Sequence, residues 1–238
     1  MKTLFIITGG NGAIGKAYFE YLAAKKEVCV SLSRTSPYFL DLLNRSRCKK
    51  IIQHLDFTNI TRIVLIHSVG SFCFEEQHQK RNNAVWHNNF STFVNIAKPL
   101  IERTQKEHIT LKLVGFGSPS DSFRIPYWKT FSSAKNAIRH YMKLVCVQHA
   151  NIQGLIVNIS STQTTNEEKL RPYADKTHWL KPQEIVEQSI YYIEQKQIET
   201  YHEIEIIKPN PGFQNYYKKT DAIYKKWMKE MYNRAETD

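Results

Sequence analysis

A glycine-rich turn near the start of the chain has residue types that could hold a diphosphate. The turn runs Thr8, Gly9, Gly10, Asn11, Gly12, Ala13, Ile14, Gly15. It follows Leu4 to Ile7, an apolar run typical of a buried strand, and apolar residues at helical spacing come next. A strand, a tight turn and a helix in this order present bare N–H groups and a positive helix end to phosphate. The turn therefore predicts a dinucleotide site.

A basic residue follows the second predicted strand, Val28 to Leu32. In dinucleotide-binding folds, an acidic residue at this place accepts the ribose 2′-hydroxyl of NAD, whereas a basic residue pairs with the 2′-phosphate of NADP. Here Ser33 stands at the acidic position, and Arg34 and Thr35 come next. These residues predict NADP(H) as the cofactor.

The turn resembles the TGxxxGxG loop of the short-chain dehydrogenase/reductase family. Thr8, Gly9 and Gly15 match that loop, and Ala13 stands where the middle glycine is usual. Two further segments are similar to family motifs: Asp56-Phe57-Thr58 to Asp-Val-Thr, and His67-Ser68-Val69-Gly70 to Asn-Asn-Ala-Gly. The resemblance implies cofactor contacts that continue beyond the turn. They are at Asp56 and Phe57 for the adenine, Ser68 and Gly70 beside its ribose, and Thr162 and Thr165 at the nicotinamide carboxamide.

The resemblance also implies hydride transfer coupled to proton transfer. In the family, a Tyr gives the proton and a Lys four residues later lowers the Tyr pKa. A Ser thirteen residues earlier binds the substrate oxygen, and a helical Asn holds a water. Ser118, Lys135 and Asn88 fit these positions, but residue 131 is Phe. Because Phe131 has no proton to give, Tyr127, one helical turn earlier, is an alternative donor.

Three functions fit these residues. The first is an NADPH-dependent reductase for a polar carbonyl or hydroxyl compound, whose proton comes from Ser118, Tyr127, Lys135 through water, or the substrate. The second is a catalytically impaired NADP-binding protein with a sensing or scaffold role. The third is a related fold that carries out another chemistry on an anionic substrate. Ser118, Lys135, Asn88 and Arg34 together favour a working cofactor site and the first function.

The order of elements predicts one α/β domain over residues 1–212, with a Rossmann-type, doubly wound, mostly parallel sheet of seven strands and helices on both faces. The expected strands are 4–7, 28–32, 51–55, 62–67, 111–116, 155–159 and 202–207, and the main helices are 14–22, 37–44, 84–103, 130–150 and 181–195. Only five residues, 57–61, join the expected third and fourth strands, and a parallel crossover needs about ten or more. We therefore expect the third crossover helix to be shortened or absent.

Two segments outside this pattern have roles of their own. Residues 160–181 are polar and long, as in a substrate lid, and their Arg171 and Lys176 could meet a polar or anionic substrate. Residues 213–238 predict an amphipathic helix, with aromatic residues on one face and lysines on the other, packed on the domain or on a partner subunit.

Composition limits the remaining classes. The chain has 238 residues, a formal net charge of +11 and four scattered cysteines without a CxxC pair. This indicates reduced thiols in a cytoplasmic protein and argues against a metal site. The net charge suits an anionic small molecule, and no segment has the pattern of a nucleic-acid module or a membrane span. From the resemblance we also expect a homodimer or homotetramer formed through the helices at 84–103 and 130–150.

Overall fold

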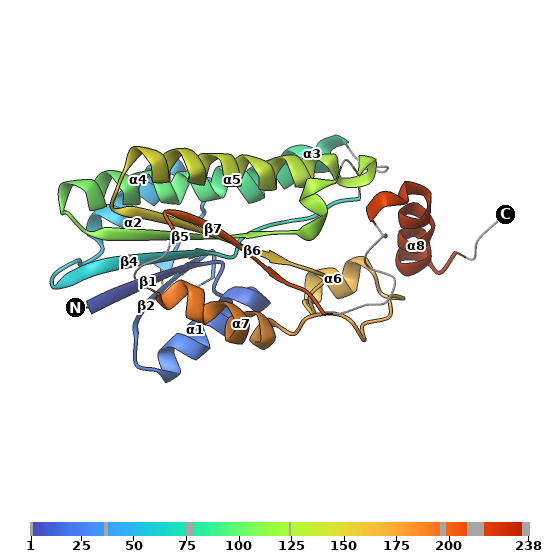
Figure 1. The fold of residues 1–238 in the computed structure, drawn as a ribbon, viewed down its shortest axis with the longest axis horizontal. Coiled ribbons are helices and arrows are strands. Elements are labelled where there is room, and N and C mark those ends of the chain that lie inside the picture. Colours follow the sequence, from blue (N-terminus) through green and yellow to red (C-terminus); the bar gives the residue numbers. More distant parts are fainter. Residues whose placement is uncertain are drawn as a thin grey trace.

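The computed structural model describes residues 2–35, 38–74, 79–123, 125–195, 199–208 and 217–234. Its centre is a seven-stranded sheet in the order β3-β2-β1-β4-β5-β6-β7, in which every pair is parallel (Figure 1). The strands are β1 (Lys2–Thr8), β2 (Val28–Ser33), β3 (Tyr38–Phe39), β4 (Ile60–His67), β5 (Thr110–Gly117), β6 (Ile152–Ile159) and β7 (Tyr201–Ile206).

Helices cover both faces of this sheet (Figure 1). One face carries α1 (Ala13–Ala24) and α7 (Pro182–Glu194), and the other carries α2 (Arg45–His54), α4 (Thr92–Lys106) and α5 (Lys129–Gln148). Near the end of the sheet where the strands finish are α3 (Gln79–Trp86), α6 (Thr165–Leu170) and α8 (Thr220–Tyr232). Because β1 is buried on both faces, its residues form a continuous apolar run. The predicted Rossmann-type α/β fold is confirmed.

The third predicted strand is wrong. Residues 51–55, expected as a strand, belong mostly to α2, and residues 37–44, expected as a helix, contain β3. A crossover helix therefore joins β3 to β4, contrary to our expectation that it is shortened or absent. The short connection lies one step earlier, because only four residues, 34–37, separate β2 from β3.

Local side-chain chemistry explains the error. Asn44 caps α2, because its side-chain oxygen accepts the N–H of Arg47 at 3.0 Å. Cys48 and Ile52, one turn apart, are the buried residues of the helix. A short apolar run such as Ile51-Ile52 fits a buried strand equally well, so periodicity alone does not separate the two. β3 is an edge strand only two residues long, which leaves almost no pattern to detect.

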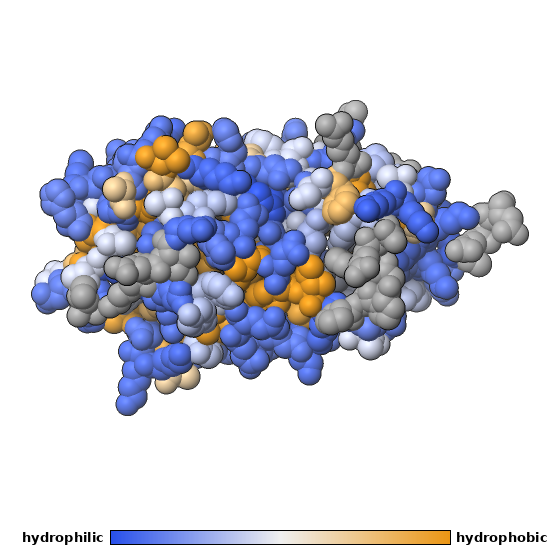
Figure 2. All heavy atoms as spheres, viewed as in Figure 1, coloured by the Kyte–Doolittle hydropathy of each residue, from blue (hydrophilic) through white to orange (hydrophobic). Residues whose placement is uncertain are grey.

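The tail contains α8, which lies within the predicted tail helix; the predicted start at 213–216 lies outside the described residues. Figure 2 shows a mostly hydrophilic surface with scattered apolar patches. In the described part of the chain, no helix is long and apolar enough to cross a membrane, and no three His, Cys, Asp or Glu side chains form a metal-binding group. The exposed Leu144 and Val147 lie on α5, and the expected homo-oligomer stays a prediction.

Proline at position 50 distinguishes the helix from the strand. Lys50 is exposed in the interior of α2. Lys50→Pro should lower the free energy of unfolding by about 3 kcal/mol or more, because proline removes a helical hydrogen bond and clashes with the preceding turn. Lys50→Ala, the matched control, should change it by less than about 0.5 kcal/mol. Urea denaturation gives both values. A strand that began at residue 51 would tolerate the proline, and equal stability of the two variants would contradict α2.

Candidate functional site

The carboxyl ends of the strands bring many, but not all, of the predicted site residues to one edge of the sheet. β1 ends at Thr8, β2 at Ser33, β4 at His67 and β5 at Gly117. All four strands are parallel. The strand order reverses at β1, because β2 lies on one side of it and β4 on the other. In open α/β sheets, ligands bind outside the carboxyl ends at the point where the strand order reverses. That point is the glycine turn after β1.

The glycine turn is shaped by backbone contacts that exclude side chains. Gly9 has a φ of +73°, in the left-handed region that favours glycine. A Cβ on Gly15 would lie 2.4 Å from Ser68 Oγ and 2.5 Å from Gly9 O. Gly12 precedes α1 with no side-chain cap, so the N–H groups of the first helical turn stay open. Open N–H groups at a positive helix end are suited to hold an anion.

Residues after β2 lie beside this turn. The Asn11 amide donates to the Thr35 hydroxyl, and the Thr35 N–H donates to Ser33 Oγ at 3.3 Å. Arg34 between them is exposed. A Cβ on Gly10 would meet Ser31 Oγ at 2.0 Å, which shows how closely the turn approaches β2. The structure therefore brings Ser33, Arg34 and Thr35 together with the turn, as the sequence predicts.

His67 joins the site to its supporting helix. Its Nδ1 lies 2.8 Å from Thr8 Oγ1 and its Nε2 lies 3.2 Å from Thr92 Oγ1 on α4. Burial, with a smaller effect of the nearby Lys135 cation, lowers the pKa of His67 to about 3. The ring is therefore neutral and connects β1, β4 and α4. Next to it, Ser68 Oγ donates to the Thr8 carbonyl at 2.6 Å.

The predicted adenine contacts Asp56 and Phe57 are wrong. Both follow α2 and precede β4, at the amino edge of the sheet near Lys2, opposite the glycine turn. Phe57 is buried there beneath the Arg103 guanidinium, which lies 3.6 Å from the ring centroid. The acidic residue after the real third strand is Asp41, two positions beyond Phe39. Its Oδ1 accepts the N–H of Leu43 at 3.0 Å.

Asp41 is thus the acidic residue at the carboxyl end of β3, where the family resemblance implies the adenine contact. The sequence contained a signal for it. Tyr38-Phe39-Leu40 is an apolar triplet directly after Pro37, and proline is typical of the start of an edge strand.

The predicted site asparagine, Asn88, lies in a π-helical turn, His87–Ser91, and the buried asparagine is one position later. Asn89, not Asn88, is fully buried; its Nδ2 donates to the carbonyls of Ser71 and Val85, both at 2.7 Å. A Cβ on Gly70 would lie 2.8 Å from Asn89 Oδ1 and 3.5 Å from Lys135 Nζ. Asn88 is half-buried and donates to Ser71 Oγ at 3.3 Å. The asparagine beside the lysine is therefore Asn89. Its buried Oδ1 has no hydrogen-bond partner among the described residues.

Lys135 carries a buried charge. The residue is 8% exposed, and burial lowers the pKa of its ammonium to about 8. In the described part of the chain, no salt bridge joins it to a carboxylate, although Asp121 and Arg139 act on it with opposite signs. Its Nζ lies 5.3 Å from the centroid of Phe131, one turn earlier on α5. The Lys135 ammonium therefore faces the ring of Phe131, the residue that stands where the family resemblance implies a tyrosine.

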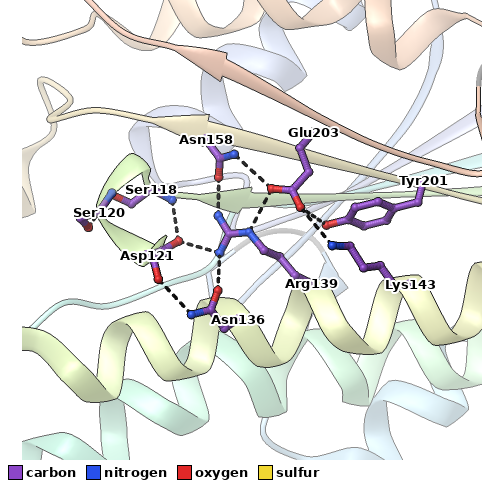
Figure 3. A network of polar contacts seen from close by, with 9 residues as sticks. All are labelled: Ser118, Ser120, Asp121, Asn136, Arg139, Lys143, Asn158, Tyr201 and Glu203. Carbon is purple, nitrogen blue, oxygen red and sulfur yellow. Dashed lines mark hydrogen bonds and ion pairs between the residues drawn. The ribbon is translucent and has the colours of Figure 1, made fainter. Parts of the chain in front are cut away.

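Ser118 lies where β5 ends, as predicted. Its Oγ accepts the N–H of Ser120 at 3.2 Å and lies 2.9 Å from Ser120 Oγ. Its own N–H donates to Asp121 Oδ2 at 2.8 Å, which closes a capping box on a 3₁₀ turn, Pro119–Ser122 (Figure 3). The Ser118 hydroxyl is held by the turn, and its proton can be donated to a substrate oxygen.

Four aromatic side chains, Phe72, Phe74, Trp128 and Trp227, form what we call the aromatic wall beside Phe131. Trp227 of α8 stacks on Phe72 with centroids 5.1 Å apart, and Phe72 contacts the edge of Phe131 at 5.1 Å. Trp227 also contacts Phe74 and Trp128 at 5.5 and 5.2 Å. The tail helix therefore packs against the segment that carries residue 131.

Tyr127, the alternative proton donor, belongs to the same cluster. Its ring stacks on Phe74 with centroids 5.2 Å apart, and it contacts the ring of Tyr224 of α8 in a tilted arrangement at 5.3 Å. These contacts orient the ring towards the tail helix. A role for Tyr127 as acid stays a prediction.

The two cations of segment 160–181 that were predicted to meet a substrate, Arg171 and Lys176, are paired with glutamates of that segment or of α8. Arg171 is 3% exposed and forms ion pairs with Glu167 and, at 2.9 Å, with Glu230 of α8. Its guanidinium also covers the Trp227 ring at 4.3 Å. Lys176 pairs with Glu168 at 3.4 Å. Arg171 therefore fixes α8 to this segment.

The two threonines predicted at the nicotinamide lie just past β6. Thr162 is buried, and its hydroxyl donates to the Ser160 carbonyl at 3.0 Å. Thr165 is exposed at the start of α6. Their role at the carboxamide stays a prediction.

A family model decides the class of this chain. The model for the NAD dependent epimerase/dehydratase family matches residues 5–162 of 238. The chain belongs to this family. The match spans the glycine turn, Ser118 and Lys135, and it ends before α6, α7 and α8. A comparison with curated proteins finds no match.

Solved structures share the fold at low identity. A 4-hydroxyisoleucine dehydrogenase complexed with NADH has a TM-score of 0.71 at 18% identity, covering 87% of this chain and 97% of its own. An alcohol dehydrogenase from the archaeon Thermococcus sibiricus complexed with 5-hydroxy-NADP has a TM-score of 0.72 at 15%, covering 90% and 100%. A Tyr-to-Phe variant of ElxO with NADPH bound has a TM-score of 0.69 at 20%, covering 86% and 97%. These likenesses show that the chain shares its Rossmann-type fold with these proteins.

The buried pair Arg171–Glu230 should anchor α8. Glu230→Ala should lower the free energy of unfolding by about 3 kcal/mol, because it leaves Arg171 buried with one partner fewer. Glu168→Ala, the control, removes a half-exposed partner of Lys176 and should cost less than about 1 kcal/mol. Chemical denaturation measures both. If the two variants lost equal stability, Arg171–Glu230 would not be an anchor.

Proposed function

We propose that this protein is an NADPH-dependent reductase of a carbonyl compound. The observation that carries the proposal is the buried ammonium of Lys135, flanked by Asn89 and by the segment that holds Ser118. A buried lysine without a salt bridge costs stability, and such groups concentrate at functional sites. When bound, the nicotinamide cofactor supplies the hydride. The residues of this chain then have to bind the carbonyl oxygen and deliver a proton to it.

In this proposal Lys135 donates the proton that a tyrosine donates in related enzymes. Its ammonium faces the ring of Phe131, so it can donate a proton where a phenol would do so. Ser118 Oγ binds the same substrate oxygen and orients it. Lys135 becomes neutral when it gives up the proton, and it is recharged from water. A donor with a pKa of about 8 suits this exchange near neutral pH.

NADP(H) is the proposed cofactor because of Arg34. The exposed guanidinium follows β2 beside the glycine turn, where a 2′-phosphate would lie. In the comparisons, ElxO has NADP bound, whereas 4-hydroxyisoleucine dehydrogenase has NADH bound. The ElxO variant with NADPH shows that a Tyr-to-Phe change in a protein of this fold is compatible with the bound cofactor.

The aromatic wall bears on the substrate. The expectation of a polar or anionic substrate relied on Arg171 and Lys176, and both are paired with glutamates. The rings near Phe131 favour an apolar group next to the reacting carbonyl. We therefore propose a carbonyl compound with an apolar substituent in place of a phosphorylated one.

A catalytically impaired NADP-binding protein is the second candidate. The same wall is compatible with it, because Phe72 packs on Phe131 and Trp227 packs on Phe72, so apolar rings cover part of the residue that lacks a hydroxyl. In this case NADPH binds, and no carbonyl compound is reduced. Assays of NADPH oxidation with aromatic, aliphatic and phosphorylated aldehydes separate the two candidates.

Arg34→Ala should weaken NADPH binding by about 10- to 100-fold, the size expected when a charged hydrogen-bonding partner is lost. NADH affinity should stay unchanged, because NADH has no 2′-phosphate. Quenching of tryptophan fluorescence on titration gives both dissociation constants. Lys106→Ala, an exposed cation at the end of α4, is the control and should change neither. No binding of either cofactor by the native protein would end the proposal.

The reduction rate should depend on pH through Lys135. Burial lowers the pKa of its ammonium to about 8, so the donating form prevails below that pH and is lost above it. We expect a constant rate below pH 8 and about a tenfold fall per unit above it, measured as NADPH oxidation. Phe131→Tyr, which supplies a phenol, should raise the rate above pH 8. A rate that stays constant to pH 10 would exclude Lys135 as the donor.

A further inference from the structure

One arginine links three neighbouring strands, β5, β6 and β7, to the helix that carries Lys135. The Arg139 guanidinium donates to Asp121 Oδ2 at 2.8 Å, to Glu203 Oε2 at 3.1 Å and to Asn158 Oδ1 (Figure 3). Asp121 follows β5, Asn158 lies on β6 and Glu203 on β7. The side chain of Asp121 is 1% exposed, so this contact is well shielded from water.

The Asp121 oxygen that accepts from Arg139 also holds the turn that carries Ser118. Asp121 Oδ2 accepts both Arg139 and the backbone N–H of Ser118, each at 2.8 Å. A second contact reinforces this one, because Asn136 Nδ2 donates to the Asp121 carbonyl at 3.0 Å. The capping turn that fixes the Ser118 hydroxyl is therefore connected to α5 through Asp121.

Arg139 also stands in register with the reacting groups. Phe131, Lys135 and Arg139 follow one another at intervals of one helical turn on α5. A rotation of α5 that displaced Lys135 would also pull Arg139 away from β5, β6 and β7. The contacts of Arg139 thus set the position of the lysine as well as that of the serine.

We propose that Arg139 is a positioning residue that holds Ser118 and Lys135 at a fixed separation for the carbonyl oxygen between them. The inference rests on the proposed function. A charged, bidentate side chain suits this role, because its planar fork fixes direction as well as distance. Two of its partners carry a negative charge, and the Glu203 carboxylate is itself held by the Tyr201 hydroxyl at 2.7 Å.

A purely structural ion pair would behave differently. Removing such a pair would lower stability but would leave the exchange of the Ser118 N–H unchanged in a variant that still folds. The chain offers a matched control in Lys143, one turn further along α5, which also pairs with Glu203, at 3.7 Å. Lys143 is half-exposed and its pair does not include Asp121. It therefore probes the same network without the contact to the catalytic segment.

The test compares the full-length native protein with Arg139→Met, Arg139→Lys and Lys143→Met. Backbone amide spectra report the Ser118 N–H and its exchange with deuterium, and fluorescence titration reports NADPH binding. In Arg139→Met, Ser118 exchange should speed up about tenfold or more, because Asp121 loses its fixed orientation. Arg139→Lys should recover part of the protection, and Lys143→Met should match the native protein.

With an active substrate, Arg139→Met should lower kcat by about tenfold or more with little change in KM, as expected for lost alignment. Native exchange at Ser118 in a folded Arg139→Met variant would overturn the inference, as would equal effects of Arg139→Met and Lys143→Met. If Arg139→Met does not fold, unchanged Ser118 exchange and kcat in Arg139→Lys would overturn it. Failure of the native protein to bind NADPH would instead refute the proposed function, and the amide comparison would still test Arg139.

Discussion

The site depends on the cost of burying the ammonium of Lys135. A cation removed from water is unfavourable unless polar groups replace its hydration. Here the face of Phe131 lies 5.3 Å from the Lys135 ammonium, and the charges of Asp121 and Arg139 act on it with opposite signs. Burial is therefore the main cause that lowers the pKa of the lysine, to about 8. A fold that retained this residue only for stability would have gained more from an apolar side chain.

The parallel sheet explains why residues far apart in the sequence meet around that lysine. Parallel strands all finish at one edge, so a short segment after each strand contributes to a common site. This made much of the site predictable. The glycine turn, Arg34, Ser118 and Lys135 have local spacings that a sequence displays directly, and all four lie at that edge. Asp56 was misplaced because its role depended on identifying the strand before it, and a strand of two residues leaves too short a pattern.

Other features could not be derived from spacing. The choice between Asn88 and Asn89 depends on the extra residue of a π-helical turn, which rotates the side chains that follow it and has no sequence signature known to us. The pairing of Arg171 with Glu230 joins residues 59 positions apart, and a sequence shows only that each is charged. An isolated cation in a polar segment suggests an anionic ligand. The same cation beside a glutamate from α8 is part of the framework.

The aromatic wall and the phenylalanine at position 131 are best understood together. A phenol at this position would need a polar partner, whereas Phe131 packs its edge on Phe72 and so extends an apolar surface that continues through Trp227. Excluding water from this side strengthens every electrostatic contact of the lysine behind it. Burial lowers the pKa of the Lys135 ammonium to about 8. In the proposed reaction, a phenylalanine at position 131 and a buried lysine one turn later therefore belong together, because the lysine supplies the proton that Phe131 lacks.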